Sequence, residues 1–147
     1  MDQEIEEQEG MKISGIFRLK GEDYFRAKEK VLTTETVMGN RAVVATGGGT
    51  WMDEENRDRL LQGGWCVWLD ASPEVVWERV RSQLPDRPLL ASSRDPLRTI
   101  QELLNARNPL YASAHVRVET TGLTPEAVAE RIEKLLRKDR PFDLPEL

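Results

Sequence analysis

The sequence predicts an α/β fold built around a parallel sheet, because short apolar runs alternate with helical segments along its 147 residues. Three runs have the β-branched and apolar content of buried strands: Ala42 to Thr46, Trp65 to Asp70 and His115 to Thr120. Each run is followed by glycine, Ser-Pro or Thr-Gly, which commonly end strands. Ligands of such sheets bind at the carboxyl ends of the strands.

Three short helices are expected before the first of these strands. They span Ile5 to Glu9, Ile13 to Leu19 and Glu22 to Leu32, and Gly10 and Gly21 separate them.

Three further helices have recognisable first turns. Ser72-Pro73-Glu74 supplies an N-cap, a proline at the first helical position and an acid in the first turn. Asp95-Pro96 and Thr124-Pro125-Glu126 begin two more helices in the same way. Apolar residues then recur at helical spacing, namely Val76, Val80 and Leu84 after the first start and Val128, Ile132, Leu135 and Leu136 after the last.

Length and composition predict one cytoplasmic domain, residues 1–138, followed by a frayed tail, 139–147. The formal net charge of -5 argues against nucleic acid or an anionic membrane as the main partner. No run approaches the roughly 18 apolar residues of a membrane span, and the acidic start of the chain is unlike a signal peptide. The single cysteine, Cys66, excludes an intrachain disulfide and is expected to be a buried strand residue.

The first strand runs into three glycines, Gly47 to Gly49. Glycine has no Cβ, so such a loop lets a ligand approach the backbone N–H groups. Taken alone, the triple glycine is equally compatible with a plain turn.

Six segments occur in an order and spacing that resemble the shikimate kinase family, and the resemblance extends from Asp2 to about Leu136. The segments are Asp2-Gln3-Glu4-Ile5-Glu6; Gly10-Met11-Lys12-Ile13-Ser14; Gly21-Glu22 with Phe25-Arg26 and Glu29; Ala45-Thr46-Gly47-Gly48-Gly49; Arg87-Pro88-Leu89-Leu90; and Arg107-Asn108-Pro109-Leu110-Tyr111.

The resemblance implies a phosphate-loop (P-loop) kinase-like, three-layer α/β fold whose five parallel strands have the order 2-3-1-4-5. It also implies a Walker A loop of the form G-x-x-x-x-G-K-[ST], and no such run occurs in the 147 residues. We therefore expect an N-terminally incomplete fold that lacks the central strand and this loop. Two explanations stay open: a fragment, as from a start codon assigned too late, or a natural homologue without the loop.

Two arginines are candidate carboxylate ligands. Arg26 lies between Glu22 and Glu29 at helical spacing, which by itself indicates a surface ion-pair ladder. Arg107 continues the apolar row of its predicted helix, where a charge needs a partner or an anion, although a snorkelling arginine also fits. The resemblance implies that both bind the substrate carboxylate and that Glu29 holds Arg26.

Other site residues follow from the resemblance. Asp2 matches the carboxylate that accepts a hydrogen bond from the attacking hydroxyl, and Gly47, Gly48 and Gly49 would offer N–H groups to the substrate. The exposed loop Leu84 to Arg94 matches a lid that brings Arg87 onto the transferring phosphoryl group. Without the resemblance, Arg87 is a solvated loop charge.

Arg79 and Pro125 match the pair that encloses adenine, with Arg81 as a nearby competitor to Arg79. His115, the single histidine, is expected to be structural, and the sequence shows no metal-ligand cluster.

The expected function is transfer of the γ-phosphoryl group of ATP, with Mg²⁺, to the 3-hydroxyl of shikimate in aromatic amino-acid biosynthesis, the isolated chain being inactive. Shikimate and ATP are the expected ligands; the family is usually monomeric, but this chain is expected to self-associate. The alternative is a non-catalytic domain that binds a small carboxylate or a partner protein. A kinase for another polyol is disfavoured by Arg26, Arg107 and the Arg87-Pro88-Leu89-Leu90 segment.

Overall fold

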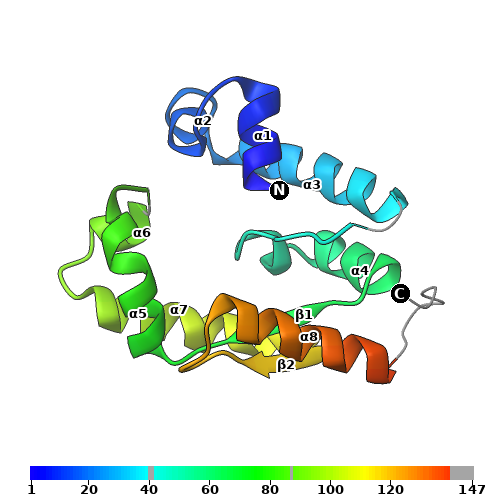
Figure 1. Ribbon diagram of the computed structural model, residues 1–147. Coiled ribbons are helices and arrows are strands. Elements are labelled where there is room, and N and C mark those ends of the chain that lie inside the picture. Colours follow the sequence, from blue (N-terminus) through cyan, green and yellow to red (C-terminus); the bar gives the residue numbers. More distant parts are fainter. Residues whose placement is uncertain (40–41, 87, 140–147) are drawn as a thin grey trace. The chain divides into compact units, whose positions relative to one another are not determined.

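The computed structural model describes residues 1–39, 42–86 and 88–139, and its contacts divide the chain into two compact units, Met1–Gly64 and Trp65–Leu147 (Figure 1). These are called the N-terminal unit and the C-terminal unit below. Arg87, and the predicted tail apart from Asp139, lie outside the described residues. In the described ranges, no helix combines the length and the apolar character that a membrane span requires.

The N-terminal unit begins with the three predicted helices, α1 (Asp2–Glu9), α2 (Ile13–Lys20) and α3 (Glu22–Met38). They are separated where expected, by Gly10 and Gly21, whose φ angles of 65° and 84° suit glycine. Helix α3 extends past the predicted end at Leu32. One buried apolar cluster holds the three helices together, and its members are Ile5, Ile16, Phe25 and Leu32.

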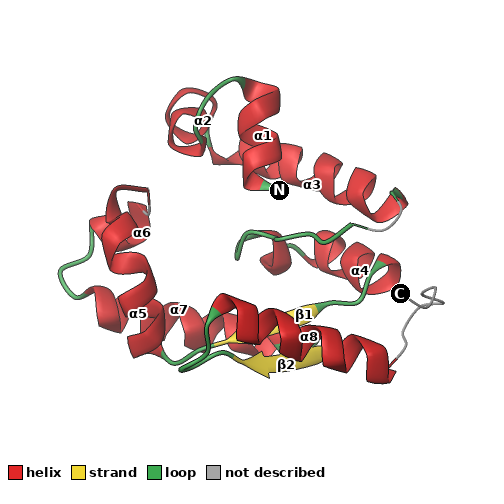
Figure 2. Cartoon of the chain, viewed as in Figure 1, coloured by secondary structure: helices red, strands yellow, loops and turns green. Residues whose placement is uncertain are grey.

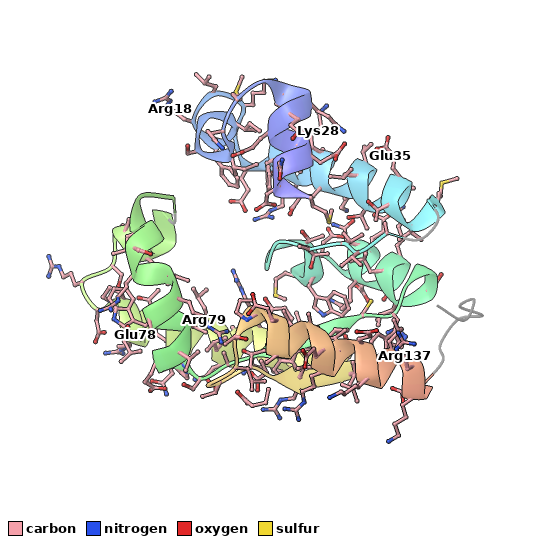
Figure 3. All side chains as sticks on the ribbon, viewed as in Figure 1. Arg18, Lys28, Glu35, Glu78, Arg79 and Arg137 are labelled. Atoms are coloured by element: carbon pink, nitrogen blue, oxygen red, sulfur yellow. The ribbon has the colours of Figure 1, made fainter. Side chains whose placement is uncertain are left out.

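Glu9, the last residue of α1, joins this helix to the other two. Its carboxylate lies 2.5 Å from Lys20 Nζ and 3.0 Å from Lys28 Nζ, and it accepts a 2.9 Å hydrogen bond from the Tyr24 hydroxyl. Lys28 is labelled in Figure 3. The hydrogen bond from Lys20, followed by that from Lys28, lowers the pKa of Glu9 to about 2. This carboxylate therefore helps fix the relative positions of the three helices.

The predicted strand Ala42 to Thr46 is not observed. The segment has no regular secondary structure, and Val43 is fully exposed. A strand is stable only when a neighbouring strand satisfies its backbone groups, and no described strand pairs with this segment.

The rest of the N-terminal unit contains a 3₁₀ turn, η1 (Thr50–Met52), and helix α4 (Glu54–Gly63). Helix α4 was not predicted from the sequence. Two features of the sequence could have predicted the start of this helix. One is Asp53, whose side chain accepts a 3.0 Å hydrogen bond from Asn56 N, and the other is a pair of acids in the first turn. Trp51 and Leu60 are buried in this part of the unit.

The C-terminal unit contains two parallel strands, β1 (Val67–Asp70) and β2 (Val116–Glu119), shown in yellow in Figure 2. Val67 lies opposite Val116, and Asp70 lies opposite Glu119. The predicted strands are thus confirmed, with slightly shorter bounds. The other elements are α5 (Pro73–Val80), η2 (Arg81–Asp86), α6 (Pro88–Ala91), α7 (Pro96–Tyr111) and α8 (Pro125–Asp139).

The three predicted helix starts are confirmed by their caps. The side chains of Ser72, Asp95 and Thr124 accept hydrogen bonds from the backbone N–H groups of Val75, Arg98 and Ala127, at 3.4, 3.1 and 3.3 Å. These bonds satisfy donors that the first turn of a helix cannot pair internally.

Two sequence expectations for this unit were wrong. The segment Leu84 to Arg94 is not a plain loop, because η2 and α6 form within it and Leu90 is buried. Pro109 does not end α7, which continues to Tyr111. Proline lacks the N–H that would bond the carbonyl four residues earlier and its ring crowds that carbonyl, so it disturbs the helix before it and leaves the two residues after it able to stay helical.

Cys66 and His115 connect the starts of β1 and β2. His115 Nδ1 accepts a 3.0 Å hydrogen bond from the backbone N–H of Cys66, which is the structural role expected for this histidine. Burial raises the pKa of the Cys66 thiol to about 11, so the group stays protonated and unreactive at neutral pH.

Candidate functional site

Arg26 is held on α3 by two carboxylates of the same helix. Its Nη1 donates to Glu29 Oε2 at 2.5 Å, and its Nε and Nη2 donate to Glu22 Oε1 at 3.2 and 3.0 Å. Burial lowers the pKa of Arg26, but the hydrogen bonds to Glu29 and Glu22 outweigh it and raise this pKa overall. The guanidinium is therefore fixed in one orientation.

Glu29 is buried, with 1% of its surface exposed, although it carries a formal charge. A buried carboxylate needs partners for its oxygens, and here both oxygens have one. Oε2 accepts from Arg26, and Oε1 accepts a 2.6 Å hydrogen bond from the Thr50 hydroxyl. Sequence reasoning missed Thr50; the only available signal was a hydroxyl residue directly after the three glycines.

The glycine loop lies against these side chains. A Cβ on Gly49 would be 2.8 Å from both Cζ and Nη2 of Arg26, which is far closer than atoms pack. A Cβ on Gly47 would be 3.5 Å from Asp2 Oδ1 and 3.6 Å from Glu29 Oε1. The structure therefore brings four of the predicted site residues together in the N-terminal unit: Asp2, Arg26, Gly47 and Gly49.

The charge of this cluster matters for what it can bind. Asp2, Glu22 and Glu29 carry three formal negative charges against the single positive charge of Arg26. A guanidinium has five N–H donors, and three are used in the bonds to Glu22 and Glu29, so two remain for a ligand. An anionic ligand of this cluster would require further positive charge.

Arg107 is a second cation suited to an anion. It is half-buried on α7 and forms no hydrogen bond or ion pair with any residue that the structure describes. On the same helix, exposed Arg98 instead pairs with Glu102 at 2.9 Å. The apolar row that predicted burial here is confirmed at Ile100, but Leu97 is exposed.

Arg79 is fixed at the carboxyl ends of the two strands. Its Nη1 donates to Thr120 Oγ1 and its Nη2 to the Thr120 carbonyl, both at 2.9 Å, and Thr120 Oγ1 donates to the Asp70 carbonyl. Arg79 is labelled in Figure 3. Among the residues that the structure describes, its competitor Arg81 forms only an exposed 3.0 Å ion pair with Glu78. Arg79 is thus the better ordered of the two.

Pro125 opens α8, a few residues after Thr120 in the same unit. Arg87 cannot be placed, because it lies outside the described residues. No group of three or more His, Cys, Asp or Glu side chains suited to a metal ion occurs in residues 1–39, 42–86 and 88–139.

Comparison with known proteins identifies the family. The family profile described as shikimate kinase matches residues 1–137. The shikimate kinase of Persephonella marina is 41% identical over 132 residues, which span 90% of this chain and 78% of that protein. A shikimate kinase of Thermus thermophilus is 44% identical over 138 residues, covering 93% of this chain and 74% of the relative.

Comparison with solved structures leads to the same family. The shikimate kinase of Acinetobacter baumannii, described in complex with shikimate, superposes with a TM-score of 0.88 at 34% identity, over 96% of this chain and 78% of that one. The Aquifex aeolicus enzyme gives a TM-score of 0.74 at 29% identity, over 96% and 80%. The predicted α/β fold class with a parallel sheet is confirmed. This chain belongs to the shikimate kinase family.

Proposed function

We propose that this chain binds shikimate, and that the reaction of the protein is phosphoryl transfer from ATP to the 3-hydroxyl of shikimate in aromatic amino-acid biosynthesis, the 147-residue chain alone being inactive. The observation that carries the proposal is the pair of Arg26 and buried Glu29 lying against the glycine loop, with Asp2 beside it. An oriented guanidinium, backbone N–H groups and a carboxylate are what recognition of a hydroxylated carboxylic acid requires.

The proposed roles follow from charge. Arg26 and Arg107 are each assigned to the substrate carboxylate, as the family pattern implies; within its own unit Arg26 is oriented by Glu22 and Glu29, and Arg107 has no partner among the described residues. Asp2 accepts the hydrogen bond of the attacking hydroxyl, as the family pattern implies. The backbone N–H groups of Gly47, Gly48 and Gly49 contact the substrate.

For ATP, the proposal assigns Arg79 and Pro125 to the adenine end, as the family pattern implies. Arg79 offers a guanidinium plane held in place by Thr120, and Pro125 follows in the same unit. The sequence has no Walker A run for the phosphates, and the described residues offer no cluster for Mg²⁺. No step of the transfer is therefore assigned through the nucleotide. In the proposal Arg87, on the lid segment, is the residue that would contact the phosphates of ATP.

Three broader expectations remain part of the proposal. They are a single domain over residues 1–138, a cytoplasmic location, and self-association of the isolated chain through unpaired strand edges. The rival function, a non-catalytic carboxylate- or partner-binding domain, is not favoured by relatives that are all named as kinases.

Calorimetry tests the proposal. Shikimate should bind the 147-residue chain, ATP should bind more weakly, and the methyl ester of shikimate should bind far more weakly than the acid because it lacks the charge that Arg26 and Arg107 pair with. Tighter binding of ATP than of shikimate, or equal binding of acid and ester, would refute this division of the site.

A further inference from the structure

Thr50 is a buried hydroxyl residue that forms hydrogen bonds with both the glycine loop and Glu29. It is 0% exposed, its N–H donates to the Gly47 carbonyl at 3.1 Å, and its hydroxyl donates to Glu29 Oε1 at 2.6 Å. The first bond closes the glycine loop into a turn, and the second attaches this turn to α3. Thr50 therefore connects the two parts of the N-terminal unit that carry candidate substrate ligands.

Glu29 can orient Arg26 only if its own carboxylate is oriented. The carboxylate has two oxygens in one plane: one accepts from Arg26 Nη1 and the other from Thr50 Oγ1. Without the Thr50 hydroxyl, the carboxylate could rotate about its last bond and Glu29 would lose a partner for a buried oxygen. Arg26, which Glu22 holds at Nε and Nη2, would then lose the fixed acceptor of its Nη1.

The Arg26 guanidinium lies in a narrow space, so even a small rotation of it would change how it meets a ligand. Gly49 comes directly before Thr50, and a Cβ there would lie 2.8 Å from Arg26 Cζ. The guanidinium thus has the glycine backbone on one side and two carboxylates at its edges. A planar fork binds a carboxylate well only when its plane is fixed.

We propose that Thr50 is a positioning residue for substrate binding: its hydroxyl orients Glu29, which orients Arg26 toward the substrate carboxylate. This inference rests on the proposed function for the identity of the ligand, but the orientation of Arg26 by Thr50 is a property of the unliganded chain. The positioning role of Thr50 also explains why a hydroxyl residue follows the glycines at a site with no access to solvent.

Thr33 provides a matched control. It is also 0% exposed and lies on α3 one turn beyond Glu29, but its hydroxyl has no hydrogen-bond partner among the described residues. Thr50→Val and Thr33→Val therefore make the same chemical change at equal burial. Only the first removes a donor to Glu29.

The experiment measures two quantities in Thr50→Val, Thr50→Ser, Thr50→Ala and Thr33→Val. The first is the set of Arg26 Nη–H signals in ¹⁵N NMR of the unliganded chain, assigned with Arg26→Lys. These signals should be resolved in the wild type, averaged by faster rotation in Thr50→Val and Thr50→Ala, and restored in Thr50→Ser. The second is shikimate affinity by calorimetry, which should fall about tenfold in Thr50→Val and Thr50→Ala but not in Thr33→Val or Thr50→Ser.

The outcomes are distinguishable. If Thr50→Val and Thr33→Val behave alike in both measurements, the positioning role is wrong. If the NMR result is as expected but the wild type binds no shikimate, Thr50 still orients Arg26 and the proposed function fails instead. Should Thr50→Val not fold, Thr50→Ala against Thr50→Ser decides the question, because both lack the γ-methyl group and only serine keeps the hydroxyl.

Discussion

Gly49 lies directly against the guanidinium of Arg26, so that any Cβ at this position would overlap it. The backbone of Gly49 has φ −75° and ψ −32°, a conformation that every residue adopts easily. A Cβ here is therefore opposed by the space that the Arg26 guanidinium occupies and not by the backbone conformation, and it would fit only if that flexible side chain moved. Gly49 therefore leaves room for the Arg26 side chain, in addition to supplying a backbone N–H group.

Gly49→Ala should displace the guanidinium of Arg26, which is the end of a flexible side chain, and so weaken shikimate binding by about tenfold, the size expected for one lost hydrogen bond to a charged group. Calorimetry checks the affinity. The control is Gly15→Ala, whose added methyl group would meet only Met11, at 3.8 Å and beyond, and which should leave affinity unchanged. Wild-type affinity in Gly49→Ala would show that Arg26 is not a ligand in this position.

Arg107→Lys should weaken shikimate binding substantially although the charge is kept, because an ammonium cannot form the two parallel bonds of a guanidinium fork. Arg98→Lys is the matched control: it lies on the same helix, is exposed and pairs with Glu102. Equal affinities for these two variants would contradict the role proposed for Arg107.

The 147-residue chain should not phosphorylate shikimate at a useful rate. It contains no Walker A lysine or loop amides, and the loss of even one oriented donor to a transition state typically costs about 10²-fold or more. The measurement is ADP release on addition of shikimate, and a chain extended by a G-x-x-x-x-G-K-[ST] strand-loop segment should regain it. Robust turnover by the chain as given, abolished by Arg87→Ala, would disprove this expectation.

Stability should fall in acid through Glu9. Its pKa is lowered from 4.5 to about 2 in the folded chain, so the carboxylate contributes its full stabilisation above about pH 4.5 and loses it as the pH falls toward 2. Chemical denaturation between about pH 6 and about pH 2.5 should show a decrease that is smaller in Glu9→Gln, which starts out less stable. Identical pH profiles for the two proteins would exclude this role.

The isolated chain should be marginally stable and should associate. In the described residues β1 pairs only with β2, so its other edge carries unpaired backbone groups, and Leu69 on this strand is exposed. Each such group kept from water costs about 1–3 kcal/mol, against a domain stability of about 5–15 kcal/mol.

Sedimentation and thermal melting test this expectation. Leu69→Lys should reduce association, whereas Leu97→Lys, the same change at an exposed leucine on α7, should not. A sharp, cooperative thermal unfolding of a monomer above about 60 °C would contradict the expectation, because it would show that the chain forms a stable core without further strands.

The sequence by itself determined the elements that depend on local chemistry. The caps at Ser72, Asp95 and Thr124 and the glycines between α1, α2 and α3 predicted helix boundaries because these residues act through bonds to their own neighbours. The ordered motifs also identified the family, the candidate site residues and the missing Walker A run.

Only the tertiary structure decided what depends on distant partners. Ala42 to Thr46 has the composition of a strand yet forms none, because a strand exists only through pairing with another. The spacing of Arg26 and Glu29 suggested an exposed ladder, but packing buried Glu29 and brought Thr50 and Gly49, far along the chain, into contact with the pair. Which hydroxyl meets a buried carboxylate is set by how the chain folds back on itself, and no local pattern records it.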